Sequence, residues 1–166
     1  GLPDTPDTAM IAIMSTNPAN PATGGWIQVD SLWFEGTDDP IANSSFEVWS
    51  QVACGEPSGW MSANLFTCLF GGDTSAMLTT DAHSGQYAVR IESVETYIPD
   101  DDGMITSNMG FLMPYTGQTD LSESLPSFPV SFNPTSLTGY YKFFPHQNDT
   151  ASIFVILTDS HGEEYR

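Results

Sequence analysis

Basic residues are almost absent from this chain. Lysine and arginine total 3 among 166 residues, against 21 aspartates and glutamates, and the formal net charge is −18. Nucleic acids and anionic membrane surfaces are bound through clustered basic side chains. We therefore expect no nucleic-acid partner and no membrane insertion, whereas a cation such as Ca²⁺ would suit so acidic a chain.

Long apolar runs are lacking as well. No run approaches the roughly 20 residues that a membrane-spanning helix needs. The chain opens with Gly-Leu-Pro, without a methionine and without a signal peptide. From these features we expect a processed or excised part of a longer protein.

Cysteine occurs only twice, at Cys54 and Cys68 in "CGEPSGWMSANLFTC". A disulfide between them would close a loop of about 15 residues and contribute about 3 kcal/mol in the chain-entropy model. Two buried free thiols are the alternative. The scarcity of lysine and the abundance of Asn, Ser, Thr and Gly favour the disulfide, and with it a secreted or cell-surface location.

Helical periodicity is nearly missing, and short runs that alternate apolar and polar residues take its place. Turns are well supplied, by 12 prolines and 14 glycines. This pattern predicts an all-β, antiparallel sandwich. We expect strands at 9–16, 26–34, 87–94, 136–144 and 152–159, weaker strands at 44–49 and 103–111, and a long surface loop at 117–134.

Several motifs together resemble a known family. "NSSFEVWS" (43–50), "PSGW" (57–60) and "DAHSGQYAVRIES" (81–93) are similar to the opening strands of galactose-binding-like jelly rolls. "PTSLTGYYKFFPHQNDTASIFVILTD" (134–159) resembles the central hairpin of the Bacteroidota version, the PCMD-type carbohydrate-metabolism domain. "DTAMIAIMSTN" and "GGWIQVDSLWFEG" resemble the last two strands of that module. The resemblance implies a jelly-roll sandwich, often found in tandem repeats of surface proteins exported by type IX secretion.

The order of these motifs departs from that pattern, because the closing strands come first. One interpretation makes 1–36 the closing strands of a preceding repeat, 37–42 a linker, and 43–166 a jelly roll that lacks its last strands. In the other, 1–36 complete a sandwich by strand exchange with another copy or by circular permutation. The pairing partner of strand 26–34 distinguishes these alternatives.

The resemblance also implies a structural calcium site. In such jelly rolls Ca²⁺ lies where the first strand, the last strand and the loop before the His-Ser-Gly strand meet. Here these positions are Glu47, Asp30 and the loop of Asp81 and Ser84. The competing interpretation is an exposed glutamate and an ordinary turn aspartate.

Catalytic signatures are poor, since the chain has no Gly-x-Ser-x-Gly elbow, no His-Glu-x-x-His pair and no phosphate-binding glycine loop. We expect no enzyme. Sugars stack on aromatic rings, and the aromatic candidates for glycan contact are Trp60, Tyr97, Tyr115 and Tyr140. A core position is the competing interpretation for each of them.

These observations favour a non-catalytic module, a structural or adhesive repeat of a surface assembly that also binds glycans. Its expected partners are other copies or neighbouring repeats of the same protein, together with glycans. The alternative function is a dedicated carbohydrate-binding module of a secreted polysaccharide-degrading protein.

Overall fold

Two antiparallel sheets packed face to face form the body of the molecule, and a separate two-stranded ribbon accompanies them. The computed structural model describes residues 5–50, 54–100, 103–115, 126–131 and 133–165, with only the backbone at 97–100 and 103–109. Its elements are β1 (Thr8–Met14), β2 (Trp26–Glu35), β3 (Trp60–Ser62), α1 (Asn64–Phe70), β4 (Ala76–Thr79), β5 (Ala88–Glu92), β6 (Val94–Asp100), β7 (Gly103–Met109), β8 (Phe111–Pro114), β9 (Phe128–Pro129), β10 (Ser136–Phe144), β11 (Ser152–Thr158) and β12 (Glu164–Tyr165).

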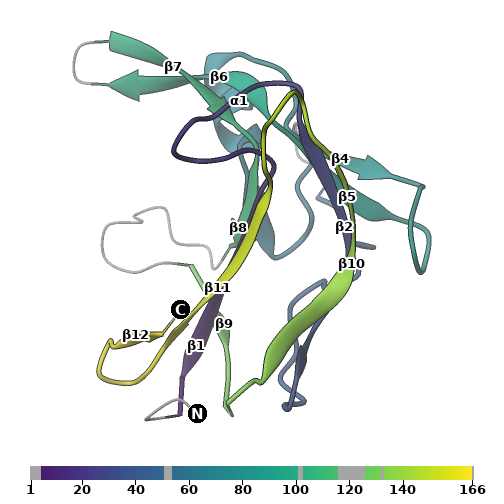
Figure 1. Ribbon diagram of the computed structural model, residues 1–166, viewed down its shortest axis with the longest axis vertical. Coiled ribbons are helices and arrows are strands. Elements are labelled where there is room, and N and C mark those ends of the chain that lie inside the picture. The colour runs from purple at the N-terminus through teal and green to yellow at the C-terminus, as the bar shows by residue number, and fades with distance from the viewer. Residues whose placement is uncertain (1–4, 51–53, 101–102, 116–125, 132, 166) are drawn as a thin grey trace.

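The first sheet, sheet A, has the strand order β12-β11-β1-β8-β3, with β9 also paired to β1. The second, sheet B, has the order β10-β2-β5-β4, and β6 pairs with β7 in the ribbon. Figure 1 looks between the two sheets, with β1 and β11 on one side and β2 and β10 on the other. The predicted all-β antiparallel sandwich is confirmed.

The core is the layer between the sheets. Alternate residues of β1 and β2, such as Ile11, Ile13, Ile27 and Val29, are buried in one apolar cluster, as the two-residue period of a strand requires. Val89 of β5 belongs to the same cluster. The outward residues of β1 are buried too, in a smaller cluster that contains Met10, Ala12 and Ile156.

The first two strands pair within the chain. β1 lies between β11 and β8, and β2 lies between β10 and β5. In particular, Ile27 is opposite Ile91, and Val29 is opposite Val89. Within this structure 1–36 and 43–166 therefore share one sandwich, and the assignment of 1–36 to a preceding repeat, to strand exchange or to a permutation stays a prediction.

Residues 37–42, expected to be a linker, pack against the sandwich. Ile41 is buried in the main cluster. Asp39 accepts hydrogen bonds from the backbone N–H and the hydroxyl of Ser131, both at 2.7 Å. The segment therefore does not separate two units of structure.

The five strongest strand predictions are confirmed, with bounds that differ by at most two residues, and strand 136–144 matches β10 at both ends. The weaker prediction of a strand at 44–49 is wrong, because the segment follows a turn at 42–45 and forms only an isolated β-bridge at its end, between Trp49 and Pro57. Phe46 adopts a φ of 57° there and is fully buried. The Asn43 side chain closes the turn by hydrogen bonds to both backbone groups of Val48. The other weak strand, 103–111, is interrupted at Gly110, which separates β7 from β8.

The predicted loop at 117–134 lies partly outside the described residues. Its described part contains the short strand β9, which pairs with β1. Phe128 and Val130 are buried in the main cluster. This part of the segment therefore contributes to the core and is not a surface loop.

Cys54 and Cys68 are paired, with Cα atoms 6.0 Å apart, a separation that fits a disulfide. Cys68 lies in α1, a seven-residue helix that strand periodicity did not predict. The buried Asn64 side chain anchors this helix by donating to the Ala76 carbonyl and accepting from the Ser75 and Ala76 backbone N–H groups. Within the described residues no helix has the length and apolarity of a membrane span.

The loop that the disulfide closes contains a carboxyl group with a buried oxygen. Glu56 accepts a hydrogen bond from the Ser62 hydroxyl at 3.0 Å, and its second oxygen has no partner among the described residues. Burial removes water from the carboxylate and raises the pKa of Glu56 from 4.5 to about 7. The protonated form is therefore the one that the folded state favours.

Glu56→Gln tests this burial. Because the pKa of Glu56 is higher in the folded than in the unfolded chain, its contribution to the free energy of unfolding should fall between about pH 4.5 and about pH 7 and stay constant above. The variant should match the wild type near pH 4 and be more stable above about pH 7, as measured by urea unfolding. Glu163→Gln, at an exposed residue, is the control and should show no such pH-dependent difference.

Candidate functional site

The expected calcium ligands meet around one loop, residues 81–87, which connects β4 to β5. Asp30 of β2, almost fully buried, accepts backbone hydrogen bonds from His83 at 2.7 Å and Ser84 at 2.8 Å. The Ser31 hydroxyl donates to the other Asp30 oxygen at 3.0 Å and also bonds the Ser84 hydroxyl. Hydrogen bonds to an ionised group are stronger than neutral ones, so Asp30 fixes the middle of the loop.

Glu47 holds the end of the same loop. Its carboxylate accepts the backbone N–H of Gln86 at 3.0 and 3.1 Å and that of Tyr87 at 3.1 Å. Gly85 lies directly against this carboxylate with a φ of +67°, and any side chain there would collide with Glu47. The glycine of the His-Ser-Gly motif therefore permits the close approach.

Asp81 fixes the start of the loop from the outside. Its carboxylate forms an ion pair with Lys142 of β10, and its carbonyl accepts a hydrogen bond from the Gln28 side chain. The hydrogen bond from Lys142 is the main cause that lowers the pKa of Asp81. Because both side chains are well exposed, this pair contributes little to stability.

The four predicted calcium ligands, Glu47, Asp30, Asp81 and Ser84, thus converge on one loop. Calcium requires six to eight oxygen ligands, whereas the groups that face Asp30 and Glu47 here are N–H and hydroxyl donors. Within the described residues no group of three or more His, Cys, Asp or Glu side chains could hold a metal ion. The carboxylates of Asp30 and Glu47 hold the loop by direct hydrogen bonds, an arrangement that we call the latch. The calcium site stays a prediction.

Trp60, expected to contact a ligand, is a core residue, and that prediction is wrong. It is only 2% exposed. Its ring packs against Phe46 and Phe128, with centroids 5.4 and 5.1 Å away. The indole N–H donates to the Ala42 carbonyl at 2.9 Å, so the whole side chain is satisfied inside the protein.

Among the other predicted aromatic contacts, Tyr140 lies on the outer face of sheet B and is 43% exposed. Its ring stacks on His83 of the latched loop, with centroids 3.3 Å apart. Trp33, 38% exposed, is its second neighbour, at 6.0 Å. Tyr115 is exposed after β8, and the side chain of Tyr97 lies outside the described residues.

Trp33 is a surface residue that simple alternation along 26–34 would turn inward, in line with Ile27 and Val29. A β-bulge reverses the alternation, because the register with β10 shifts between Thr138 and Tyr140. Ser31 sits at this shift with a φ of 54°. An extra residue in one strand re-aims the side chains that follow it, so Trp33 points outward beside Tyr140.

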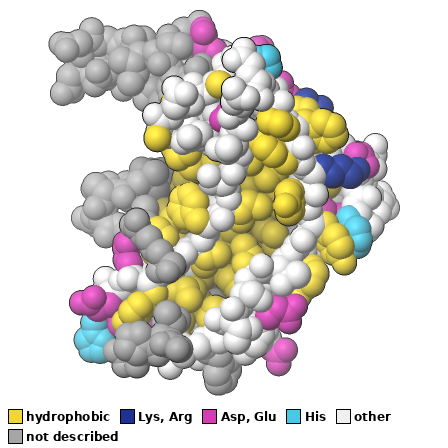
Figure 2. Space-filling model, viewed as in Figure 1, with side chains coloured by type: hydrophobic (Ala, Val, Ile, Leu, Met, Phe, Trp, Pro, Cys, Tyr) yellow, Lys and Arg dark blue, Asp and Glu magenta, His cyan; other side chains and the backbone are white. Residues whose placement is uncertain are grey.

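The most unusual surface is an open side of the sandwich between β10 and β11, the first of which is the edge strand of sheet B. Residues that face the core from these strands reach solvent, with Tyr141 66% and Ile153 39% exposed. Figure 2 shows hydrophobic side chains running down the middle of the molecule, between the two sheets. Tyr141 is opposite the buried Val29 in the ladder, which confirms its inward direction.

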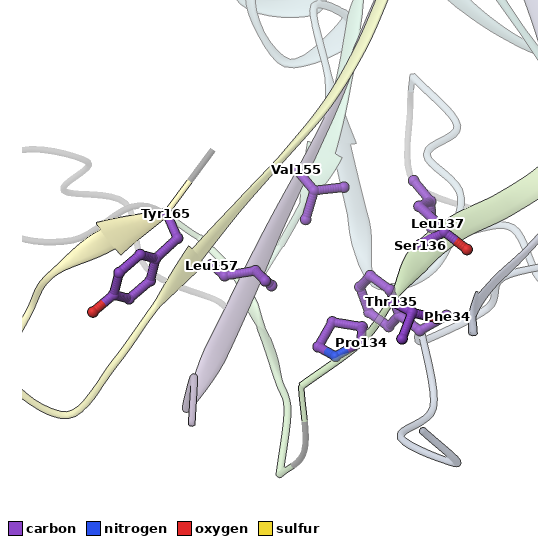
Figure 3. A pocket seen from close by; sticks show the side chains of 8 residues that line it. All are labelled: Phe34, Pro134, Thr135, Ser136, Leu137, Val155, Leu157 and Tyr165. Atoms are coloured by element: carbon purple, nitrogen blue, oxygen red, sulfur yellow. The ribbon is translucent and has the colours of Figure 1, made fainter. Parts of the chain in front are cut away.

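Two apolar cavities follow this open side. One, of about 190 Å³, is lined by residues that include Phe34, Pro134 and Tyr165 (Figure 3). The other, of about 280 Å³, is lined by residues that include Tyr141 and Ile153. The two cavities share Leu137 and Val155 in their lining, so they adjoin each other, and together they are called the groove.

β12 borders the lower end of this groove, where Tyr165 is one of the lining residues. A turn centred on Asp159 positions this strand, since the Asp159 carboxylate accepts the backbone N–H of Glu163 at 2.9 Å, that of His161 at 2.9 Å and the Tyr165 hydroxyl at 3.1 Å. These bonds, that from Glu163 first, lower the pKa of Asp159. β12 pairs with β11 at Leu157 and Thr158, so it lies beside one end of the groove.

Asp30→Asn tests the latch. The amide would place an N–H₂ group or a weaker acceptor against two backbone donors, so the free energy of unfolding should fall by about 2 kcal/mol. Urea unfolding in EDTA measures this loss, and hydrogen exchange should show faster exchange at His83 and Ser84. Asp38→Asn, at an exposed residue, is the control. An unchanged loop exchange rate would contradict the latch.

The same pair of proteins tests the predicted calcium site. A structural Ca²⁺ ion held by Asp30 would raise the unfolding midpoint of the wild type in calcium above that in EDTA. It would leave the midpoint of Asp30→Asn unchanged. Equal midpoints of the wild type in the two solutions would contradict the calcium prediction and leave the latch in place.

Comparison with known proteins gives no relative: no family model, no curated protein and no solved structure matches the chain. The resemblance to galactose-binding-like jelly rolls therefore stays a prediction. The candidate sites rest on the geometry of the described residues, namely the latched loop, the Trp33–Tyr140 pair and the groove between β10 and β11.

Proposed function

We propose that the chain is a non-catalytic module of a secreted or cell-surface protein, a structural or adhesive repeat that associates with neighbouring polypeptides through its open side. The observation that carries this proposal is the exposure of core-facing residues, above all Tyr141 and Ile153. Contiguous exposed apolar surface marks a site of interaction. The expected partners are neighbouring repeats or other copies, and the disulfide supports a location outside the cytoplasm.

The chemistry of the acidic groups also supports a non-catalytic role. Hydrogen bonds within a turn lower the pKa of Asp159, and the hydrogen bond from Lys142 lowers the pKa of Asp81. Burial raises the pKa of Glu56. The pKa of Asp149 is lowered as well, and its carboxylate accepts two backbone N–H groups. Each of these four shifted groups thus has its own structural setting. Perturbed carboxyl groups in a catalytic site would instead converge on one cleft.

Charge screening tests association through the open side. Two chains of charge −18 repel each other, and raising the salt from about 0.15 M to about 1 M shortens the Debye length from about 8 Å to about 3 Å. Sedimentation velocity should then show a monomer at the lower salt and reversible association at the higher. Ile153→Lys should remain monomeric in both solutions.

Leu78→Lys is the matched control for this experiment. Leu78 is 42% exposed, close to the 39% of Ile153, but it lies on β4, at the opposite edge of sheet B. This variant should associate as the wild type does. Equal loss of association in the two variants, or a wild type that is monomeric at both salts, would contradict the proposal.

Glycan binding is the second function, and one specific observation favours it. Trp33 and Tyr140 are adjacent and exposed on the outer face of sheet B, and polar groups of the latched loop lie beside them. Exposed aromatic rings with nearby hydrogen-bonding groups are suited to sugars. A dedicated carbohydrate-binding module would use this face.

A glycan array with two tryptophan variants tests this second function. Trp33→Ala should abolish binding and leave the thermal midpoint nearly unchanged, because its ring is at the surface. Trp60→Ala should cost about 3–5 kcal/mol of stability, since it opens a cavity in the core. Binding that survives in Trp33→Ala at full strength would exclude the Trp33–Tyr140 face as the glycan site.

A further inference from the structure

Among the described strands, none pairs with the outer edge of β10 in sheet B. β10 has nine residues, and within the described residues it pairs only with β2. In an antiparallel sheet alternate residues of an edge strand direct both N–H and C=O away from the ladder. Such an edge is a template for another strand, and here it borders the apolar groove.

The groove lies where a strand added beside β10 would run. The core-facing residues of β10, Leu137 and Tyr141, and those of β11, Ile153 and Val155, line the cavity of about 280 Å³. A strand added beside β10 would direct every second side chain into this cavity. Apolar residues at those positions would cover Tyr141 and Ile153, while the residues between them would face solvent.

β12 borders the groove at its lower end. It pairs with the edge of β11 at two positions, and Tyr165 lies opposite Leu157 and is one of the residues that line the lower cavity (Figure 3). A strand therefore already contributes one side chain to the lining on this side of the molecule. A helix would leave the backbone groups of β10 unsatisfied, whereas a strand would pair with them.

The charge of the whole chain favours one kind of strand. None of the described residues that line the two cavities is charged, whereas the chain carries a net charge of −18. Lys142, the one basic residue of β10, is already paired with Asp81. A second copy brings the same charge of −18, so at physiological salt it is a poor occupant, whereas a strand with basic ends complements the charge of the chain.

We infer that a partner polypeptide other than a second copy completes the sandwich with one extended strand, which pairs with β10, inserts alternate apolar side chains into the groove and carries basic instead of acidic residues. This inference rests on the proposed function, because it specifies how the open side binds its neighbour. Strand addition of this kind draws affinity from main-chain hydrogen bonds and specificity from alternate side chains.

The probe is a synthetic peptide as long as the nine-residue β10, Lys-Val-Thr-Val-Thr-Val-Thr-Val-Lys, labelled with a zwitterionic rhodamine. Fluorescence anisotropy with the full chain at physiological salt should show saturable binding. A peptide with glutamate in place of both lysines should bind at least about tenfold more weakly. A peptide with proline at the central threonine should lose binding, because proline removes an N–H donor.

Two variants place the peptide on the molecule. Ile153→Lys and Tyr141→Lys, both at partly exposed residues that can be replaced without burying the new charge, should each weaken binding at least about tenfold. Leu78→Lys on the opposite edge should bind as the wild type does. Hydrogen exchange should show protection of alternate β10 amides when the peptide is bound.

Each of the following outcomes would overturn the inference. No binding, or equal binding of the proline peptide, would contradict strand pairing, and equal binding of the glutamate peptide would contradict the charge requirement. A dimer at physiological salt that excludes the peptide would identify a second copy as the occupant. If salt-induced association still depends on Ile153 while the peptide fails to bind, the proposed function survives and only the strand inference fails.

Discussion

The apolar layer between β1 and β2 is the contact on which the rest of the structure depends. Each of these strands is central in its own sheet, and each has a neighbour on both sides. Ile13 of β1 and Ile27 of β2 lie in one buried cluster. Because the two strands already occupy the centres of the sheets, the later strands β10 and β11 become neighbours at one side of the sandwich, where their core-facing residues meet solvent.

Acidic residues serve this fold mainly as hydrogen-bond acceptors. Asp30, Glu47 and Asp159 each take two or more backbone N–H groups from a loop or turn. A chain with so few basic residues has few ion pairs available, and backbone N–H donors supply the partial positive charge in their place. Carboxylates thus fix loops by accepting backbone N–H groups. The remaining net negative charge disfavours an acidic partner at the groove.

Much of the fold could be predicted from two-residue periodicity, because a half-buried strand must alternate. The prediction failed where local groups override that period. Phe46 follows a turn that the Asn43 side chain closes, and its ring is buried in the core. The strand predicted there is therefore a loop whose apolar residue packs into the core. The bulge at Ser31 likewise reversed Trp33, and no single-sequence pattern locates a bulge.

The candidate site was predictable in part. The motifs around Asp30, Glu47 and Ser84 indicated a common location, and the structure brings them to one loop, although with backbone donors around the carboxylates. Trp60 could not be assigned correctly, since the same residue type serves as core or as ligand platform, and its burial between Phe46 and Phe128 depends on contacts distant in sequence. The groove could not be predicted from the sequence either, because it arises from the order of the strands in the two sheets.

The open side makes the charge of the chain important for its association with other molecules. An unpaired edge beside an apolar groove is normally a hazard, and natural proteins protect such edges with charge. In this chain the net charge of −18 acts against the approach of a second copy. Repulsion between copies is long-range and is screened by salt, whereas a strand with basic ends meets no such barrier. Under the proposed strand addition, the same charge would therefore favour a different polypeptide over a second copy at this edge.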